Sequence, residues 1–338
     1  MGSSASGSLL VQPLYKDCTN TSVGFIPLND MSAEQDYFNE EGGLYGEGMN
    51  VLPLSHPHSI QANQAALQVL PRNASGGIDV QGGKIGLISI GMSNTKNEFE
   101  TFIEVAQFEK SDQVVLVNGA QPGMTASDWA NPDPANDPWK TLADAILAAG
   151  LAPAQVQVVW LKQANGNPEP GVDDFPVYAQ KLHDDLGEIV KSARQSYPNI
   201  WLVYFSSRIY AGYGQTNPLN PEPFAYESAF SVRWLIEDQI NGGGSTGVDY
   251  TSAPVLLWGP YLWADGTTPR SDGLAWLCED LLLDGTHPSP AGKQKVAGML
   301  LDFLTTDRLA RIWFTGMDQR VFSPIIFAHD VKGLPISR

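Results

Sequence analysis

The feature that most constrains this chain is a series of five short apolar runs that begins at residue 85. They span residues 85–90, 113–117, 156–161, 200–205 and 255–258. Apolar residues at helical spacing lie between them, as in Phe99, Phe102 and Ala106 after the first run. Short apolar runs are typical of strands buried on both faces, and strands that alternate with helices form parallel sheets. The sequence therefore predicts an α/β protein, a three-layer α/β/α sandwich around a five-stranded parallel sheet.

Capping residues mark where several of the intervening helices begin and end. Asp137 followed by Pro138 fits an N-cap with proline at the first helical position, and Gly150 fits the end of that helix. Ser289 and Pro290 begin the last predicted helix in the same way. Further helices are predicted over residues 178–193 and 226–240 from the spacing of their apolar side chains.

Residues 9–84 differ from the rest of the chain because they lack sustained periodicity and are rich in Gly, Pro, Asn and Ser. Apolar and aromatic residues nevertheless recur throughout this stretch, which disfavours disorder. The sequence predicts a loop-rich extension over 9–84 packed near the active-site edge, an α/β/α domain over 85–310 and a C-terminal tail over 311–338. Residues 1–8 (MGSSASGS) have the composition of an expression leader and are left out of this prediction.

Charge and cysteine content exclude several classes of protein. The 20 Lys and Arg residues stand against 37 Asp and Glu, a formal net charge of −17, so neither nucleic acid nor an anionic membrane surface is expected as a partner. No apolar run approaches the roughly 20 residues of a membrane span. Two cysteines are too few for a disulfide scaffold or a Cys-rich zinc site. Cys18 and Cys278 either pair, which suits a secreted or periplasmic protein, or remain two buried thiols.

The first apolar run leads into Gly91, Met92 and Ser93, which places a serine at the turn between a strand and a helix. In a parallel sheet this turn lies at the carboxyl edge, where ligands bind. A serine there has an exposed hydroxyl, and its backbone N–H lies at a helix N-terminus, which favours a developing anion. The alternative is a simple helix-capping serine. The turn lacks the second glycine of the G-x-S-x-G elbow, which argues against an α/β-hydrolase.

The segment 281–292 (LLLDGTHPSPAG) carries Asp284 and His287 just before the last predicted helix. On a tight turn, a carboxylate three residues before a histidine accepts a hydrogen bond from Nδ1–H and leaves Nε2 free as a base. The alternative is a capping aspartate beside a surface histidine. Because this loop and Ser93 lie at the same edge of the predicted sheet, the combination favours nucleophilic catalysis.

Because of the serine turn and the Asp284–His287 segment, residues 85–305 resemble the SGNH (GDSL-type) hydrolases. This family has a flavodoxin-like α/β/α fold. The first motif of the family, usually Gly-Asp-Ser, matches Gly91-Met92-Ser93 followed by Asn94. The remaining motifs match Gly123, Asn165 and Asp284-Gly285-Thr286-His287. The chain departs from the family at Met92, where an aspartate is usual, and at Gly166, where the aspartate after the motif asparagine is missing.

The resemblance implies a mechanism in which Ser93 attacks an ester carbonyl, His287 takes its proton and Asp284 steadies the imidazolium. It also implies an oxyanion hole made of the N–H groups of Ser93 and Gly123 and the Asn165 side chain. Gln163 is a second choice for that side chain, because Trp160 and Gln163 loosely echo the Trp-x-Gln-Gly-Glu stretch of some family members that act on sugar acetates. No metal and no organic cofactor are expected, and no H-E-x-x-H, Walker or G-x-G-x-x-G pattern occurs.

Aromatic residues and one arginine after the later strands are the candidates for substrate contacts: Arg208, Tyr210 and Trp263. Aromatic faces suit sugar rings, and a guanidinium suits a carboxylate or a sugar hydroxyl; loop packing and a structural ion pair are the alternatives. The predicted function is a serine esterase for small acyl esters, with acetyl esters of carbohydrates as the candidate substrates. An inactive carbohydrate-binding protein on the same fold and an acyltransferase remain the alternatives. The oligomeric state is left open.

Overall fold

The computed structural model describes residues 16–214 and 219–316. Its sheet contains β3 (Ile85–Gly91), β4 (Val114–Asn118), β5 (Val156–Lys162), β6 (Leu202–Phe205) and β7 (Val255–Trp258). All neighbouring strands are parallel, in the order β4-β3-β5-β6-β7. This is the 2-1-3-4-5 order of flavodoxin-like sheets. The predicted fold class is confirmed, because each of the five apolar runs forms one strand.

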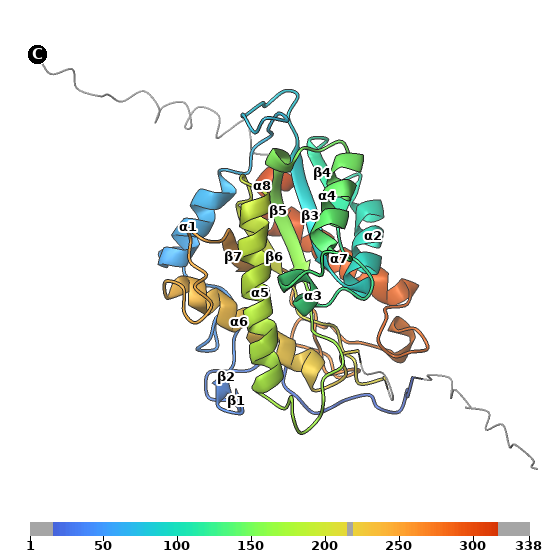
Figure 1. The fold of residues 1–338 in the computed structure, drawn as a ribbon. Coiled ribbons are helices and arrows are strands. Elements are labelled where there is room, and N and C mark those ends of the chain that lie inside the picture. Colours follow the sequence, from blue (N-terminus) through green and yellow to red (C-terminus); the bar gives the residue numbers. More distant parts are fainter. Residues whose placement is uncertain (1–15, 215–218, 317–338) are drawn as a thin grey trace, which may run out of the picture.

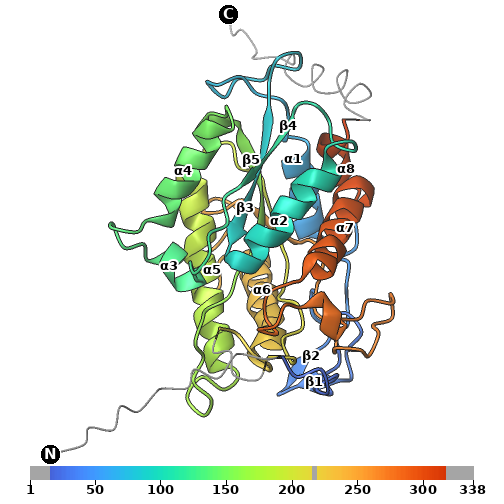
Figure 2. The same ribbon diagram turned by 90° about the vertical axis from the view of Figure 1, so that its right-hand side faces the viewer.

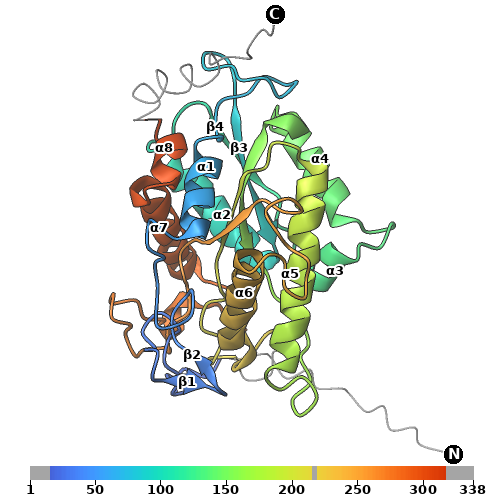
Figure 3. The ribbon, with the colours of Figure 1, turned by 90° about the vertical axis from the view of Figure 1, so that its left-hand side faces the viewer.

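Helices cover both faces of the sheet, as Figures 1, 2 and 3 show. One face carries α1 (Pro57–Ala66), α2 (Ser93–Ala106), α7 (Pro290–Thr306) and α8 (Ala310–Phe314). The other carries α3 (Ala126–Ala130), α4 (Pro138–Ala148), α5 (Val177–Ser196) and α6 (Phe224–Ile240). Short 3₁₀ turns occur at η1 (Pro153–Gln155) and η2 (Cys278–Asp280). The Asp137 side chain caps α4 by accepting a hydrogen bond from Trp139 N, as predicted.

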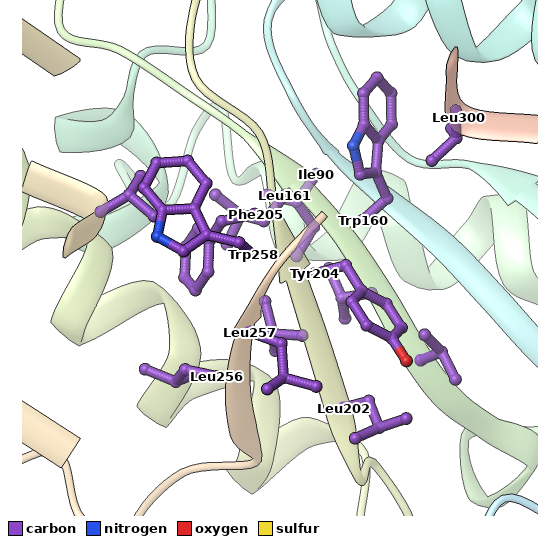
Figure 4. Close-up of a cluster of buried hydrophobic side chains, with 14 of the residues drawn as sticks. Ile90, Trp160, Leu161, Leu202, Tyr204, Phe205, Leu256, Leu257, Trp258 and Leu300 are labelled. Carbon is purple, nitrogen blue, oxygen red and sulfur yellow. The ribbon is translucent and has the colours of Figure 1, made fainter. Parts of the chain in front are cut away.

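The core lies on both faces of the sheet, which explains why the strands read as continuous apolar runs. All seven residues of β5 are buried. In Figure 4, Trp160 and Tyr204 point to the face where Leu300 of α7 lies, and Phe205 points to the opposite face. Burial of such side chains on both faces is the main stabilising contribution, at roughly 25 cal/mol per Å² of apolar surface. It also fixes the register of the strand ends, from which the candidate site is built.

The N-terminal extension runs over the surface from one edge of the sheet to the other. At the carboxyl edge, Lys16 N donates to Leu283 O at 2.7 Å, and Cys18 forms a disulfide with Cys278. The two-residue strands β1 (Asp36–Tyr37) and β2 (Glu40–Glu41) follow, and α1 packs beside β7. Arg72 and Lys84 then pair at the amino edge, with Arg72 N donating to Lys84 O at 3.0 Å. The structure thus resolves the open cysteine alternative in favour of pairing.

The domain boundaries predicted from the sequence remain a proposal. Residues 9–15 of the predicted extension, the leader-like residues 1–8 and residues 317–338 of the predicted tail lie outside the described residues. Helix α8 crosses the predicted boundary at residue 311, and its Trp313 and Phe314 are buried against the core. In the part of the chain that the structure describes, no helix combines the length and hydropathy that crossing a membrane requires.

Candidate active site

Ser93 is the first residue of α2 and lies two residues after the end of strand β3. Met92 is extended (φ −94°, ψ −163°) and separates the last strand residue from the first helical residue. Gly91 is required at this crossing, because a Cβ there would lie 2.4 Å from Lys162 O on the neighbouring strand. This close approach turns the Ser93 side chain to the carboxyl edge of the sheet. Among the described residues, the Ser93 N–H has no hydrogen-bond partner, as is usual for the first N–H of a helix.

The structure brings Ser93, His287 and Asp284 together in one hydrogen-bonded line. Ser93 Oγ lies 2.7 Å from His287 Nε2, and His287 Nδ1 lies 2.6 Å from Asp284 Oδ2. The second carboxylate oxygen, Asp284 Oδ1, accepts hydrogen bonds from Thr286 N at 3.0 Å and His287 N at 2.9 Å. Asp284 therefore orients both the ring and the backbone of His287. This is the arrangement of a nucleophile, a base and a residue that orients the base.

The surroundings of Asp284 keep it ionised. Burial of the carboxyl raises its pKa, but hydrogen bonds from the backbone N–H groups of Thr286 and His287, and from the His287 ring, lower it by more. The pKa of Asp284 is therefore below its ordinary value. The His287 and Asp284 side chains remain 23% and 26% exposed, so both can exchange protons with solvent.

Two further residues support the loop that carries Asp284 and His287. Asn94, buried in the first turn of α2, donates from Nδ2 to Thr286 O at 2.9 Å and so ties the serine helix to this loop. Gly285 has a φ of +67°, and a Cβ there would lie 2.6 Å from Gly214 N. The sequence reasoning noted Asn94 only as the residue after the serine. The bond across 192 residues could not be read from that position.

Two of the predicted oxyanion residues, Gly123 and Asn165, line a polar cleft. Gly123 (φ +79°) and Asn165 both line a cavity of about 710 Å³. Within the described ranges the Gly123 N–H has no hydrogen-bond partner, and the backbone at Gln121 is tied to the serine turn by Gln121 N donating to Gly91 O at 2.9 Å. These contacts place the Gly123 loop beside the strand end that carries Ser93.

The two candidates for the oxyanion side chain have different contacts. Asn165 accepts at Oδ1 from Ser127 N (2.9 Å) and donates from Nδ2 to Asp185 Oδ2 (2.7 Å). Gln163 is buried, and its Nε2 donates to Met124 O at 3.1 Å. Each amide nitrogen carries a second N–H. Asn165 lines the cleft and Gln163 does not, which favours Asn165.

The three predicted substrate contacts are all buried, which corrects the expectation for two of them. The Tyr210 hydroxyl donates to Asn20 O at 2.9 Å, and Trp263 Nε1 donates to Glu222 Oε1 at 2.8 Å. Both rings are fully enclosed and pack against other aromatic rings, so neither can contact a substrate. Arg208 is also buried, and its Nε and Nη1 have no hydrogen-bond partner among the residues that the structure describes.

A buried ion pair that sequence reasoning missed lies behind the serine helix. Lys162 Nζ lies 2.6 Å from both carboxylate oxygens of Glu98, and both side chains have 0% exposure. Thr95 of α2 donates from Oγ1 to Lys162 O at 2.7 Å. These contacts hold α2 against the end of β5.

Residues 16–214 and 219–316 contain no group of three or more His, Cys, Asp or Glu placed to hold a metal ion.

Comparison with known proteins yields likenesses among solved structures only. No protein-family model and no curated protein matches the chain. A lipase from a goat rumen metagenome is 14% identical, covering 67% of this chain and 100% of its own, with a TM-score of 0.39. An acetyl-xylooligosaccharide esterase from Geobacillus is 14% identical, covering 65% and 93%, with a TM-score of 0.39.

The periplasmic domain of a lipopolysaccharide acetyltransferase from Salmonella Paratyphi A is also 14% identical, covering 74% of this chain and 96% of its own, with a TM-score of 0.35. At these identities and TM-scores the likenesses do not identify a substrate. The strand order and the positions of the serine turn and the Asp-x-x-His loop give the chain the α/β/α fold expected from its resemblance to the SGNH hydrolases.

Proposed function

We propose that this protein is a serine esterase that hydrolyses small acyl esters, with acetyl esters of carbohydrates as its substrate class. One observation carries the proposal: Ser93 Oγ, His287 and Asp284 form a continuous hydrogen-bonded line with contacts of 2.7 Å and 2.6 Å. The N–H groups of Ser93 and Gly123 are without partners in the described part of the chain, so they are available to an oxyanion.

In the first half of the reaction, Ser93 Oγ attacks the ester carbonyl carbon and passes its proton to His287 Nε2. Negative charge collects on the former carbonyl oxygen, where the N–H groups of Ser93 and Gly123 and the second amide N–H of Asn165 stabilise it. One such donor typically contributes on the order of 3 kcal/mol to the transition state. His287 then gives its proton to the departing alcohol oxygen, and the acyl group remains on Ser93.

In the second half, His287 Nε2 removes a proton from water, which attacks the acyl carbon. The acid leaves when the proton returns to Ser93 Oγ. Asp284 accepts the Nδ1–H of the imidazolium in both halves and stays ionised, in keeping with its lowered pKa. If a sugar hydroxyl takes the place of water, the same residues perform acyl transfer.

The cleft lined by Gly123 and Asn165 supports a carbohydrate substrate over a lipid. Its lining is mostly polar and offers carboxylates, amides and hydroxyls as hydrogen-bond partners for sugar hydroxyl groups: Thr125, Ser127, Asp128, Asn165, Asn167, Asp173, Asp184 and Asp185. A long acyl chain would find few apolar walls there. The Cys18–Cys278 disulfide supports a secreted or periplasmic location, because such bonds persist in oxidising compartments.

The decisive experiment is hydrolysis of 4-nitrophenyl acetate by the wild type and by Ser93→Ala. We expect kcat/KM to fall at least about 10⁴-fold, with unchanged circular dichroism and thermal unfolding. Ser75→Ala is the matched control, because Ser75 is exposed on the loop before β3 and lies outside the cleft lining. Retained activity in Ser93→Ala would refute the proposal.

Two further measurements separate the alternatives. A fluorophosphonate should label the folded wild type at Ser93, and absence of both labelling and hydrolysis would favour an inactive carbohydrate-binding protein. Product analysis with an acetyl donor and a sugar acceptor distinguishes hydrolysis, which releases acetate, from transfer, which yields an acetylated acceptor.

A further inference from the structure

The loop that carries Asp284 and His287 is a short hairpin held by two segments that are far away in the sequence. We call residues 281–289 the Asp-His hairpin. Leu282 N donates to the carbonyl oxygen of His287 at 2.8 Å and closes it. The hairpin forms no regular strand or helix, so contacts with its neighbours fix its position. Helix α2 is one such neighbour, and the other is the N-terminal segment, by which we mean residues 16–20.

Lys16 holds the first half of the hairpin with both its backbone and its side chain. Its N–H donates to Leu283 O at 2.7 Å, next to Asp284. Its Nζ donates to Leu281 O at 2.6 Å and also to Cys278 O. An ammonium group has three donors, and hydrogen bonds from a charged donor are stronger than neutral ones. One residue thus binds three carbonyl groups that precede Asp284.

The N-terminal segment also contacts the loop on which the hairpin rests. Asp17 N donates to Tyr213 O at 2.8 Å. The next residue along that loop, Gly214, lies against the hairpin, since a Cβ on Gly285 would be 2.6 Å from Gly214 N. The segment therefore holds both the hairpin and the backbone that packs against it.

One covalent bond keeps the N-terminal segment in this place. Cys18 forms a disulfide with Cys278, 260 residues later in the chain and one of the residues whose carbonyl group Lys16 binds. Cys18 is exposed, so a soluble thiol can reach the bond. Once the bond is broken, hydrogen bonds alone oppose the conformational entropy that the freed segment regains.

We propose that Lys16 and Cys18 are positioning residues that keep the Asp-His hairpin in line with Ser93. Reduction of the Cys18–Cys278 bond therefore lowers turnover without unfolding the protein. This inference rests on the proposed esterase function and gives the N-terminal segment a part in it. A misplacement of about 1 Å can cost a catalytic group about 100-fold in rate, so a loosened hairpin lowers kcat more than it changes KM.

The first test is reduction of the wild type with the dithiol dithiothreitol. One thiolate of the reagent attacks a sulfur atom of the disulfide, and its second thiolate displaces the mixed disulfide. The reagent leaves as a cyclic disulfide, and both cysteines become thiols. After removal of the reagent, kcat for 4-nitrophenyl acetate should be about 10- to 100-fold lower, with KM changed less than about twofold and circular dichroism unchanged. Reoxidation should restore kcat.

The variant Cys18→Ala/Cys278→Ala is the control for the reagent. It should have the low kcat of the reduced wild type from the start and should not respond to dithiothreitol. If this variant does not fold, the reduced wild type still decides the question. An unchanged kcat in reduced wild type with two free thiols counted would overturn the proposal.

The second test keeps the disulfide and removes the lysine contacts. Lys16→Met should lower kcat about three- to tenfold at constant KM, the size of one or two hydrogen bonds, and Lys16→Arg should recover part of the loss because a guanidinium also donates to carbonyl groups. Lys84→Met is the matched control. Lys84 Nζ donates to Gly150 O at 2.8 Å at the opposite edge of the sheet, so kcat should not change. Equal effects of Lys16→Met and Lys84→Met would overturn the positioning role.

Hydrogen exchange separates failure of this proposal from failure of the proposed function. Reduction or Lys16→Met should speed amide exchange within residues 281–287 at least about fivefold, while the amides of the core strand β5 keep their rates. Unchanged exchange in the hairpin would overturn the positioning role, whatever the activity. Faster exchange in a protein that shows no esterase activity would instead refute the proposed function and leave the contact between the two segments in place.

Discussion

The carboxyl edge of the sheet carries two acid–base pairs that have the same contact distance and opposite surroundings. Asp284 and His287 approach within 2.6 Å and remain 26% and 23% exposed. Lys162 and Glu98 also approach within 2.6 Å, but both have 0% exposure. The first pair ends at the hydroxyl of Ser93, whereas the second joins the serine helix α2 to the end of β5.

The difference in burial separates two tasks that one active site requires. A pair that moves protons needs access to solvent and substrate and must tolerate both charge states of its base. A pair that holds a helix in place gains from being sealed off, because breaking it leaves an uncompensated charge in a medium of low dielectric constant. Substitutions in the first pair should therefore affect the rate, and those in the second the stability.

The largest expected effect is that of Asp284→Asn on turnover. An asparagine amide cannot stabilise the imidazolium and favours the wrong tautomer of His287, so kcat for 4-nitrophenyl acetate should fall about 10⁴-fold. The free energy of unfolding near pH 7 should change much less, because the pair is partly exposed. Parallel measurement of kcat and urea unfolding tests this. A large loss of stability with a small loss of kcat would show that the Asp284–His287 pair stabilises the fold and does not drive catalysis.

Lys162→Met should give the opposite result. It leaves Glu98 buried without its cation, and removal of one partner from such a pair typically costs about 3–5 kcal/mol in the free energy of unfolding. Lys140→Met is the matched control, because Lys140 pairs with Asp144 on an exposed face (3.1 Å; 76% and 67% exposed) and should cost less than about 1 kcal/mol. Urea unfolding of the three proteins measures both values. Equal midpoints would show that the buried pair does not support the fold.

The exposed pair could be predicted from the sequence, and the buried pair could not. Asp284 and His287 are three residues apart on one loop, so a local pattern predicts their contact. Ser93 is marked by its place between an apolar run and a helical pattern, and the parallel topology brings it to the same edge. Glu98 and Lys162 are 64 residues apart and occur in ordinary helical and strand patterns, so only the packing of α2 on β5 makes them partners.

The substrate side was predicted less well for the same reason. Tyr210 and Trp263 follow strands, as cleft residues do, but the Tyr210 hydroxyl donates to Asn20 O of the N-terminal segment, and Trp263 packs against Tyr226. No local signal reveals that a segment 190 residues earlier in the chain lies over this loop. The pairing of Cys18 with Cys278 stayed open at the sequence level because it depends on the same packing. Helix α1 was missed because the sequence around it lacks a clear apolar stripe.

Glu227 extends the comparison to a buried carboxylate that forms no ion pair with any described residue. It is 1% exposed, its Oε1 accepts from the Tyr37 hydroxyl at 2.7 Å, and its Oε2 has no hydrogen-bond partner within residues 16–214 and 219–316. Burial raises the pKa of Glu227 from 4.5 to about 7. The folded state therefore holds a proton that the unfolded state has lost between these values, and stability falls as pH rises through this window.

Glu227→Gln should remove that part of the pH dependence, which amounts to at most about 3 kcal/mol. Tyr37→Phe should instead increase this pH dependence. The Tyr37 hydrogen bond lowers the pKa of Glu227, so losing it raises that pKa further. Free energies of unfolding measured from pH 4.5 to pH 8 for the three proteins test this. Identical slopes for wild type and Glu227→Gln would contradict a proton bound at this site.

The smallest expected effect tests whether the two tasks are coupled. Asn94 is buried like the Lys162–Glu98 pair, but its bond to Thr286 O reaches the loop of the exposed pair. Asn94→Ala should cost about 1 kcal/mol of stability, the net contribution of one neutral hydrogen bond. It should also lower kcat about tenfold with little change in KM, because the loop no longer holds His287 in line with Ser93. Asn97→Ala, one turn further along α2, is the control and should leave kcat unchanged. If Asn94→Ala lowers stability without lowering kcat, the attachment of α2 and the alignment of His287 with Ser93 are independent of each other.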